Sequence, residues 1–172
     1  PVIVSTSGHR LLSVDAQECV KQRLLPLSML VTPNIPEMVA LADSPVATYR
    51  EKEQAATILL DYGAKAILLK GCHEEGETKS DILFTKSHSK VESTIFTSAT
   101  IPTRNTHGTG CTLSSAIAAY MARGCDIVEA ISKAKEFVTE ALQSGADVAI
   151  GRGNGPVNHG FNPQKMIVYD NE

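Results

Sequence analysis

Hydrophobic and polar positions along the chain follow two periods, and these predict a succession of strands and helices. Strand-like runs occupy residues 2–4, 28–32, 66–70, 81–86 and 91–97, with a short run at 166–169 that we expect as an edge strand. Helix-like spacing or helix-forming composition occupies residues 13–25, 35–42, 50–62, 113–123 and 126–144. Strands that alternate with helices through short loops predict an α/β fold, with a mostly parallel sheet covered by helices.

The predicted helices have recognisable start and stop residues. Ser13 is expected to cap the first helix and Pro26 to end it. Gly63 and Gly124 follow two later helices, in the place where a glycine commonly ends a helix. We expect the first helix to bury Val14, Cys19, Val20 and Leu24, and the helix at 50–62 to bury Ala55, Ala56, Leu59 and Leu60.

Polar clusters follow three of the predicted strands. They are Ser5–Gly8, Thr32–Glu37 and Lys70–His73, and in the last of them we expect Gly71–His73 to turn the chain. In parallel sheets, ligands gather at the carboxyl ends of the strands. We therefore expect these clusters to form one site together with the glycine-containing loop at residues 105–112.

That loop reads Asn-Thr-His-Gly-Thr-Gly-Cys-Thr and leads into a predicted helix. Gly108 and Gly110 lack Cβ atoms, so the backbone can turn sharply and approach a ligand closely. The first N–H groups of a helix have no internal partner and lie at its positive end, which suits an anion such as phosphate. The alternative is an ordinary loop before a core helix, because a short Gly-x-Gly is weak evidence alone.

Cys111 falls in the first turn of the same helix. The helix dipole and the free N–H groups favour a thiolate there, which permits a base, a nucleophile or a stabiliser of the transition state. The alternative is a small buried residue that packs the helix start. A cysteine hydrolase needs a histidine base near the thiol. His107 is near in sequence, but the loop around it suits anion binding better.

Asn34 and Glu37 follow a predicted strand and open a helix, where their side chains share one face. A carboxylate with waters commonly holds Mg²⁺ beside phosphates. The alternative is a capping box, with Asn34 as the N-cap and Glu37 three residues later. Lys70 ends an apolar strand, so its ammonium either extends to solvent or meets a phosphate as a point charge.

Composition and charge narrow the class of protein. The chain has 172 residues, 42% hydrophobic and 20% charged, which is typical of a soluble globular protein. A net charge of −3 gives no electrostatic footprint for nucleic acid, and no apolar run is long enough for a membrane span. Four scattered cysteines without a CxxC pair favour reduced thiols, so we expect a cytoplasmic location.

Several segments together resemble one enzyme family. Residues 105–114 resemble the anion-hole signature of the hydroxymethylpyrimidine/phosphomethylpyrimidine kinases, which are ribokinase-like enzymes of thiamine biosynthesis. Residues 1–8, 30–37, 69–73 and 151–159 resemble further motifs of that family, in the family's order. Each motif alone is unspecific, but the combination is highly specific and covers nearly the whole chain.

The resemblance implies a reaction and roles for the loop. ATP would donate its γ-phosphate to hydroxymethylpyrimidine and then to the monophosphate. Cys111 would deprotonate the substrate hydroxyl or assist at the reacting phosphate. Backbone N–H groups of Gly108, Thr109 and Gly110 would stabilise the charge that develops on the transferred group.

The resemblance also implies roles for the other polar residues. Glu37, with Asn34 in an NxxE pattern, would organise Mg²⁺. Lys70 would contact the nucleotide phosphates, and Thr106 would support them. Cys72 stands where the family usually has a glycine, which alters the turn after Lys70 without removing a catalytic group.

The fold implied by the resemblance is a ribokinase-like, Rossmann-like three-layer sandwich. Residues 1–172 would be the C-terminal part of a single kinase domain whose N-terminal strands are missing, with that missing segment as a partner. The family also implies a homodimer. Two alternatives stay open: a pyridoxal (vitamin B6) kinase, which shares the cysteine-type anion loop, and a catalytically silent nucleotide-binding fragment. Residues 33–37 and 155–159 favour the pyrimidine branch.

Overall fold

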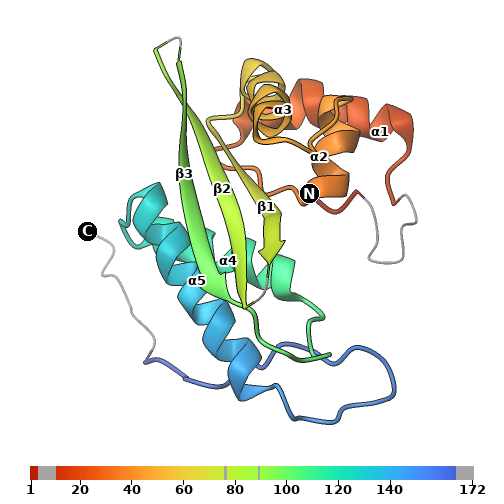
Figure 1. The fold of residues 1–172 in the computed structure, drawn as a ribbon. Helices are drawn as coiled ribbons and strands as arrows, with labels where there is room; N and C mark the ends of the chain where they lie inside the picture. The colour runs from red at the N-terminus through yellow and green to blue at the C-terminus, as the bar shows by residue number, and fades with distance from the viewer. Residues whose placement is uncertain (4–10, 76, 89, 166–172) are drawn as a thin grey trace. The chain divides into compact units, whose positions relative to one another are not determined.

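The computed structural model of this chain describes residues 1–3, 11–75, 77–88 and 90–165 (Figure 1). Contacts divide the chain into two compact units, Pro1–Thr97 and Ser98–Glu172. The polar cluster at residues 5–8 and the expected edge strand at 166–169 lie outside the described residues. Of the expected strand at 2–4, residues 2 and 3 are described and are not in a strand.

The first unit begins with a helix whose character changes along its length. It starts as α1 (Val14–Cys19), continues as a π-helix (Val20–Leu24) and ends in a 3-10 turn (Leu25–Leu27). Ser13 is the N-cap, as expected, and its hydroxyl accepts the N–H of Ala16 at 3.3 Å.

The expected buried stripe of this helix is wrong. Val14 and Leu24 are 63% and 56% exposed. Cys19 is exposed too, and Val20 is only half-buried. The π-helical turn has a longer period than an α-helix, so α-helical spacing does not identify the face that it buries. The buried positions are instead Gln17 and Leu25.

Helices α2 (Ile35–Ala42) and α3 (Tyr49–Asp61) agree with the predicted segments to within one residue. Each begins with a complete capping box, and in α3 this box pairs Thr48 with Glu51. Gly63 follows α3 with a φ of +108°, which favours glycine. The face of α3 predicted to be buried is confirmed at Ala55, Ala56, Leu59 and Leu60.

A three-stranded sheet of order β1-β2-β3 follows, formed by β1 (Ala66–Glu75), β2 (Thr78–Ser87) and β3 (Lys90–Ala99) (Figure 1). The strands expected at residues 81–86 and 91–97 are therefore present as β2 and β3, and both are longer than expected. β1 and β2 are antiparallel. Parallel pairing comes from the predicted strand before α2, because Val31 and Asn34 form parallel bridges with Ile67 and Lys70.

The turn expected at Gly71–His73 is wrong, because β1 continues through these residues to Glu75. The register with β2 shifts between Leu69 and His73, so the segment is an irregularity within the strand. Gly71 has a φ of +67° and donates its N–H to Asp81 Oδ1 at 2.8 Å. A glycine with positive φ suits a bulge as well as a turn, and the sequence alone does not separate the two.

The core of the first unit lies among α2, α3 and the sheet. Met38 and Leu41 of α2, Ala55 and Leu59 of α3, and Ile67, Leu69 and Phe84 of the strands are all fully buried. Ile3, from the described start of the chain, is buried in the same cluster. The polar residues before α2 and along β1 are therefore attached to a packed framework.

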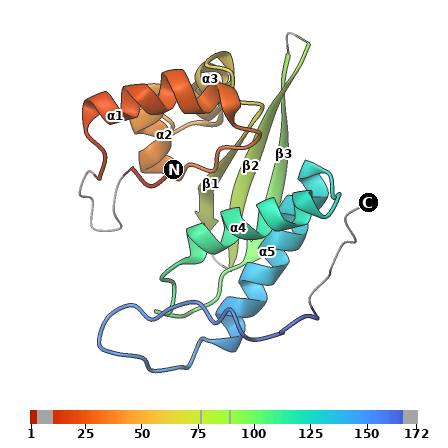
Figure 2. The ribbon, with the colours of Figure 1, turned by 180° about the vertical axis from the view of Figure 1, so that it is seen from behind.

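The second unit contains α4 (Thr109–Ala122) and α5 (Ile127–Ser144), which pack against each other (Figure 2). Its buried apolar residues include Leu113 and Ile117 of α4, and Ala130, Ile131, Ala134, Val138 and Ala141 of α5. Gly124 ends α4 with a φ of +92°, as its position predicted. Residues 145–159, which we name the closing segment, have no helix or strand, only an isolated bridge between Pro156 and His107. In the described part of the chain, no helix is long and apolar enough to cross a membrane.

Candidate functional site

The anion loop, residues 105–111, brings its backbone into the first turn of α4. Gly108 is the N-cap, with a φ of +90°, and no side chain caps the helix. The N–H of Thr109 is bonded to the Thr106 carbonyl at 3.2 Å. The N–H groups of Gly110 and Cys111 lie at the second and third helical positions, where a helix offers no internal acceptor. The start of α4 therefore presents backbone donors at the positive end of a helix.

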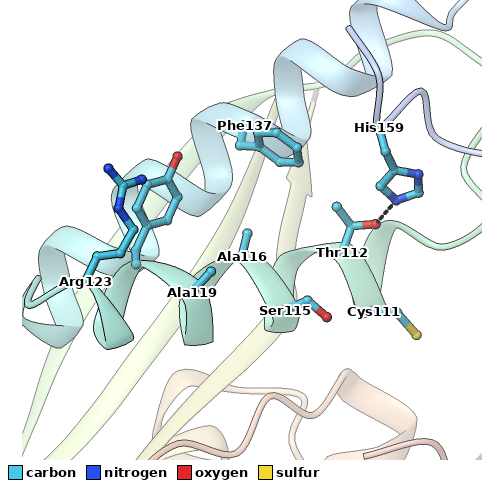
Figure 3. A pocket seen from close by; sticks show the side chains of 9 residues that line it. Cys111, Thr112, Ser115, Ala116, Ala119, Arg123, Phe137 and His159 are labelled. Carbon is cyan, nitrogen blue, oxygen red and sulfur yellow. Dashed lines mark hydrogen bonds between the residues drawn. The ribbon is translucent and has the colours of Figure 1, made fainter. Parts of the chain in front are cut away.

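Cys111 is exposed in this first turn, so the alternative of a small buried packing residue is wrong. Figure 3 shows its sulfur pointing away from Phe137 and His159. Cys111 also borders a cavity of about 520 Å³ along α4, lined mainly by apolar side chains that include Ala116, Ala119 and Phe137. An accessible thiol beside free backbone donors can take a proton from a ligand held at the loop.

The remaining loop residues fix its shape. Thr106 contributes its carbonyl, which accepts both the N–H and the hydroxyl of Thr109. Asn105 is buried, and its amide donates to the carbonyls of Gly145 and Val148 at 2.6 and 2.7 Å. The loop is thus tied to the closing segment through a side chain that sequence reasoning did not single out as functional.

Gly155 in the closing segment explains why this contact is close. An added Cβ there would overlap the side-chain amide of Asn105. His107 donates its N–H to the Gly155 carbonyl at 3.0 Å, and its own carbonyl accepts the N–H of Val157 at 3.1 Å. The glycines of residues 151–155 were a visible signal of close backbone approach, but the sequence did not show what they approach.

A second cavity, of about 590 Å³, lies beside the N-terminal end of the anion loop. Residues 102–105 line one side of it, and residues 146–153 of the closing segment line the other. Its lining combines apolar side chains with three exposed charged residues, Arg104, Asp147 and Arg152. A cavity of this size can hold the heterocycle and sugar of a nucleotide.

Asn34 and Glu37 lie together at the start of α2 and form the capping box in full. Asn34 Oδ1 accepts the N–H of Glu37 at 2.8 Å, and Glu37 Oε2 accepts the N–H of Asn34 at 2.9 Å. The other oxygen of Glu37 accepts the N–H of Ile3 at 3.3 Å, and Glu37 is only 4% exposed. The geometry therefore gives these two residues the capping role.

Lys70 lies next to them along the backbone. Its N–H is bonded to the Pro33 carbonyl at 2.9 Å, and it is bridged to Asn34. Lys70 itself is half-buried, directly before the bulge at Gly71. The described contacts thus gather the predicted residues into two groups, with Asn34, Glu37 and Lys70 in the first unit and Thr106 and Gly108–Cys111 in the second.

These residues do not fit a magnesium ion held directly by the protein. Both oxygens of Glu37 already accept backbone N–H groups inside the unit. Among residues 1–3, 11–75, 77–88 and 90–165, no three His, Cys, Asp or Glu side chains form a group that could hold a metal. The prediction that Glu37 is a ligand of Mg²⁺ therefore has no support in the donor set.

Comparison with known proteins gives one family. The protein-family model of phosphomethylpyrimidine kinase matches residues 1–158 of this chain. The hydroxymethylpyrimidine/phosphomethylpyrimidine kinase of Escherichia coli (strain K12) is 41% identical over 159 residues, which are 92% of this chain and 58% of that protein. The chain therefore spans a little over half the length of this relative.

Solved structures share the fold. The phosphomethylpyrimidine kinase from Clostridium difficile 630 is 34% identical with a TM-score of 0.65, over 83% of this chain and 55% of that one. The pyridoxal kinase from Staphylococcus aureus in complex with AMP-PCP is 29% identical with a TM-score of 0.79, over 94% of this chain and 56% of that one. The expected α/β class, of ribokinase-like type, is confirmed by these similarities.

Proposed function

The chain belongs to the phosphomethylpyrimidine kinase family, and on that premise we propose that it takes part in ATP-dependent phosphorylation of hydroxymethylpyrimidine and of its monophosphate. This chemistry belongs to thiamine biosynthesis. The observation that carries the proposal is the start of α4, where an exposed thiol and uncapped backbone donors stand side by side. Phosphoryl transfer needs positioning and electrostatic stabilisation more than covalent chemistry, and this arrangement can supply both.

In this proposal, the nucleotide occupies the second unit. Its base and sugar fill the cavity between residues 102–105 and 146–153, and its phosphates extend to the N–H groups of Gly110 and Cys111. The cavity and the anion loop adjoin at Asn105, which supports this order. Gly108 and Thr109 hold the turn, and Thr106 supports it through its carbonyl.

Cys111 is the proposed base. Its thiolate takes the proton of the substrate hydroxyl, and the hydroxyl oxygen forms a bond to the γ-phosphorus while the bond to the β–γ bridging oxygen breaks. ADP leaves with the electron pair of that bond. The N–H groups at the helix start favour the charge that develops on the phosphoryl oxygens during the transfer.

Lys70 and Mg²⁺ complete the proposal. Lys70 acts as a point charge for the nucleotide phosphates, as the resemblance implied. Mg²⁺ would enter together with ATP, because the described side chains do not fit a site that holds the ion directly. From the family we also propose a cytoplasmic location and a homodimer. Light scattering would measure the mass of the assembly in solution.

A pyridoxal kinase is the second candidate. The observation in its favour is the higher TM-score with the pyridoxal kinase of Staphylococcus aureus. Sequence identity favours the pyrimidine kinases, at 41% against 29%. Identity is the better guide to the substrate here, because both branches share the fold.

The test is ATP-dependent phosphorylation of hydroxymethylpyrimidine, with pyridoxal assayed beside it. The intact mass of the sample identifies which polypeptides are present in the assay. Turnover of the pyrimidine and not of pyridoxal supports the proposal. Preferred turnover of pyridoxal contradicts it, and ATP binding without turnover of either substrate favours a nucleotide-binding fragment.

A further inference from the structure

The closing segment contacts the anion loop at two points and the adjoining helix α4 at a third, through a side chain at its far end. Asn105 makes the first contact and His107 the second, as described above. At the end of the segment, His159 Nε2 lies 2.8 Å from the hydroxyl of Thr112 in α4, as Figure 3 shows. The two glycines of the loop therefore lie between contacts that the same segment makes on either side.

The direction of the Thr112–His159 hydrogen bond follows from the partners of Thr112. Its hydroxyl has one hydrogen and lies 2.8 Å from the carbonyl of Gly108, which can only accept. The hydroxyl therefore donates to Gly108 and accepts from His159, so Nε2 of His159 carries a proton. This assigns the donor role to the histidine without any appeal to its charge.

The chain of bonds ends at the helix cap. The carbonyl of Gly108 accepts both the N–H and the hydroxyl of Thr112, each at 2.8 Å. Gly108 is also the residue with the left-handed backbone that aims the next N–H groups outward. A donor on Thr112 polarises its hydroxyl and fixes its rotamer, so His159 acts on the cap through Thr112.

From this geometry we propose that His159 is a positioning residue, which holds the Gly108 turn in the form that presents its N–H groups to the terminal phosphates of a nucleotide. The proposal rests on the proposed function, because it concerns the same phosphate site. His159 is exposed and does not line the cavity at residues 102–105 and 146–153. Loss of His159 should therefore weaken the binding of the terminal phosphates and leave the binding of the rest of the nucleotide unchanged.

The affinities of ATP and AMP separate these two effects, because AMP lacks the β- and γ-phosphates. Titration calorimetry on the purified protein would give both dissociation constants. In the His159→Ala variant, we expect ATP to bind about three- to fivefold more weakly and AMP to change less than about twofold, the size of one neutral hydrogen bond. His159→Gln keeps an N–H donor in reach of Thr112 and should restore the ATP affinity.

Two threonine variants test the same Thr112–His159 hydrogen bond, one at Thr112 itself and one as a control. Thr112→Val removes the hydroxyl at nearly constant volume, and we expect the same selective loss for ATP. Thr139→Val is the matched control, since the Thr139 hydroxyl makes the same kind of bond, to the carbonyl of Lys135 four residues earlier at 2.8 Å, and Thr139 lies within α5. Thermal unfolding of each variant keeps a loss of folding apart from a loss of affinity.

The outcomes are distinct. A wild-type protein that binds neither nucleotide would overturn the proposed function, and this inference with it. A wild-type protein that binds ATP, with a His159→Ala variant that keeps the wild-type ratio of the two dissociation constants, would overturn this inference alone. Equal weakening of ATP and AMP would also overturn it, because that result describes a general structural role.

Discussion

Helices α2 and α4 each begin after a polar loop, and their first turns meet the same need in opposite ways. In α2, Asn34 and Glu37 cap each other, and the second oxygen of Glu37 is taken by Ile3. In α4, a glycine stands at the N-cap and no side chain satisfies the first turn. Glu37 is buried, whereas Cys111 is exposed.

The difference between the two helix starts shows which polar motif is available to a ligand. A carboxylate whose oxygens accept backbone N–H groups stabilises its own helix start and has little capacity left for a metal. A glycine cap contributes nothing to the helix start except shape, so the N–H groups that follow remain for an anion. The NxxE pattern and the glycine loop therefore predict different things, although both were candidate sites.

The largest expected effect concerns the start of α4, where no side chain caps the helix. Cys111→Ala should lower the rate of phosphoryl transfer on the order of 10²–10⁴-fold, the usual contribution of a general base, with the ATP affinity almost unchanged. Steady-state kinetics and ATP titration measure the two quantities. Cys125→Ala is the matched control, because Cys125 directly precedes the N-cap of α5 and has no proposed role. Retained turnover in Cys111→Ala would remove the thiol from the mechanism.

The next effect concerns the start of α2, where Asn34 and Glu37 form the capping box. Glu37→Ala should lower the free energy of unfolding by roughly 2–4 kcal/mol, because it removes a buried cap and leaves the N–H groups of Asn34 and Ile3 without their acceptor. Chemical denaturation measures this. Glu51→Ala is the matched control, since Glu51 closes the same kind of capping box at the start of α3 but is not buried, so its loss should cost less.

The same position tests the metal assignment. In Glu37→Gln, we expect the Mg²⁺ concentration for half-maximal ATP binding to stay at the wild-type value. A strong increase of that concentration, in a variant as stable as the wild type, would return Glu37 to the metal and remove the contrast between the two helix starts.

The third effect concerns Lys70 of the first unit, which we propose as a positive charge for the phosphates of the nucleotide. Lys70→Met should weaken ATP binding about tenfold, the size of one charge-assisted hydrogen bond, and weaken AMP binding less. Lys65→Met provides the control, because Lys65 is exposed just before the same strand. Equal ATP affinity in both variants would leave the anion loop without help from this lysine.

Local patterns were enough to predict much of this molecule. The bounds of α2, the buried face of α3, the cap at Ser13 and the position of Cys111 in a first helical turn depend on residues within a few positions of one another. Helix caps and periodicity are local interactions, so a sequence displays them directly.

Long-range contacts were not predictable in the same way. Asn105 bonds to carbonyls 40 and 43 residues away, and nothing near Asn105 in the sequence indicates those partners. The bulge at Gly71 depends on Asp81 in the neighbouring strand. The π-helix after Cys19 changes the buried face without a visible break in the pattern. In each case the deciding partner is distant or the period changes, and a window of a single helix or strand contains neither signal.

The smallest expected effect isolates the glycine cap itself. Gly108 and Gly124 bound the same helix, have φ values of +90° and +92°, and leave open space where a Cβ would stand. Alanine at either position should therefore cost about the same stability, near 1 kcal/mol, from backbone strain alone. Only Gly108→Ala should also weaken ATP binding, by a few-fold, because the strain is relieved by turning the next N–H groups away from the phosphates. Denaturation and ATP titration on the two variants measure both quantities. Equal ATP affinity in the two variants would mean that the left-handed cap serves the fold of α4 and not the anion.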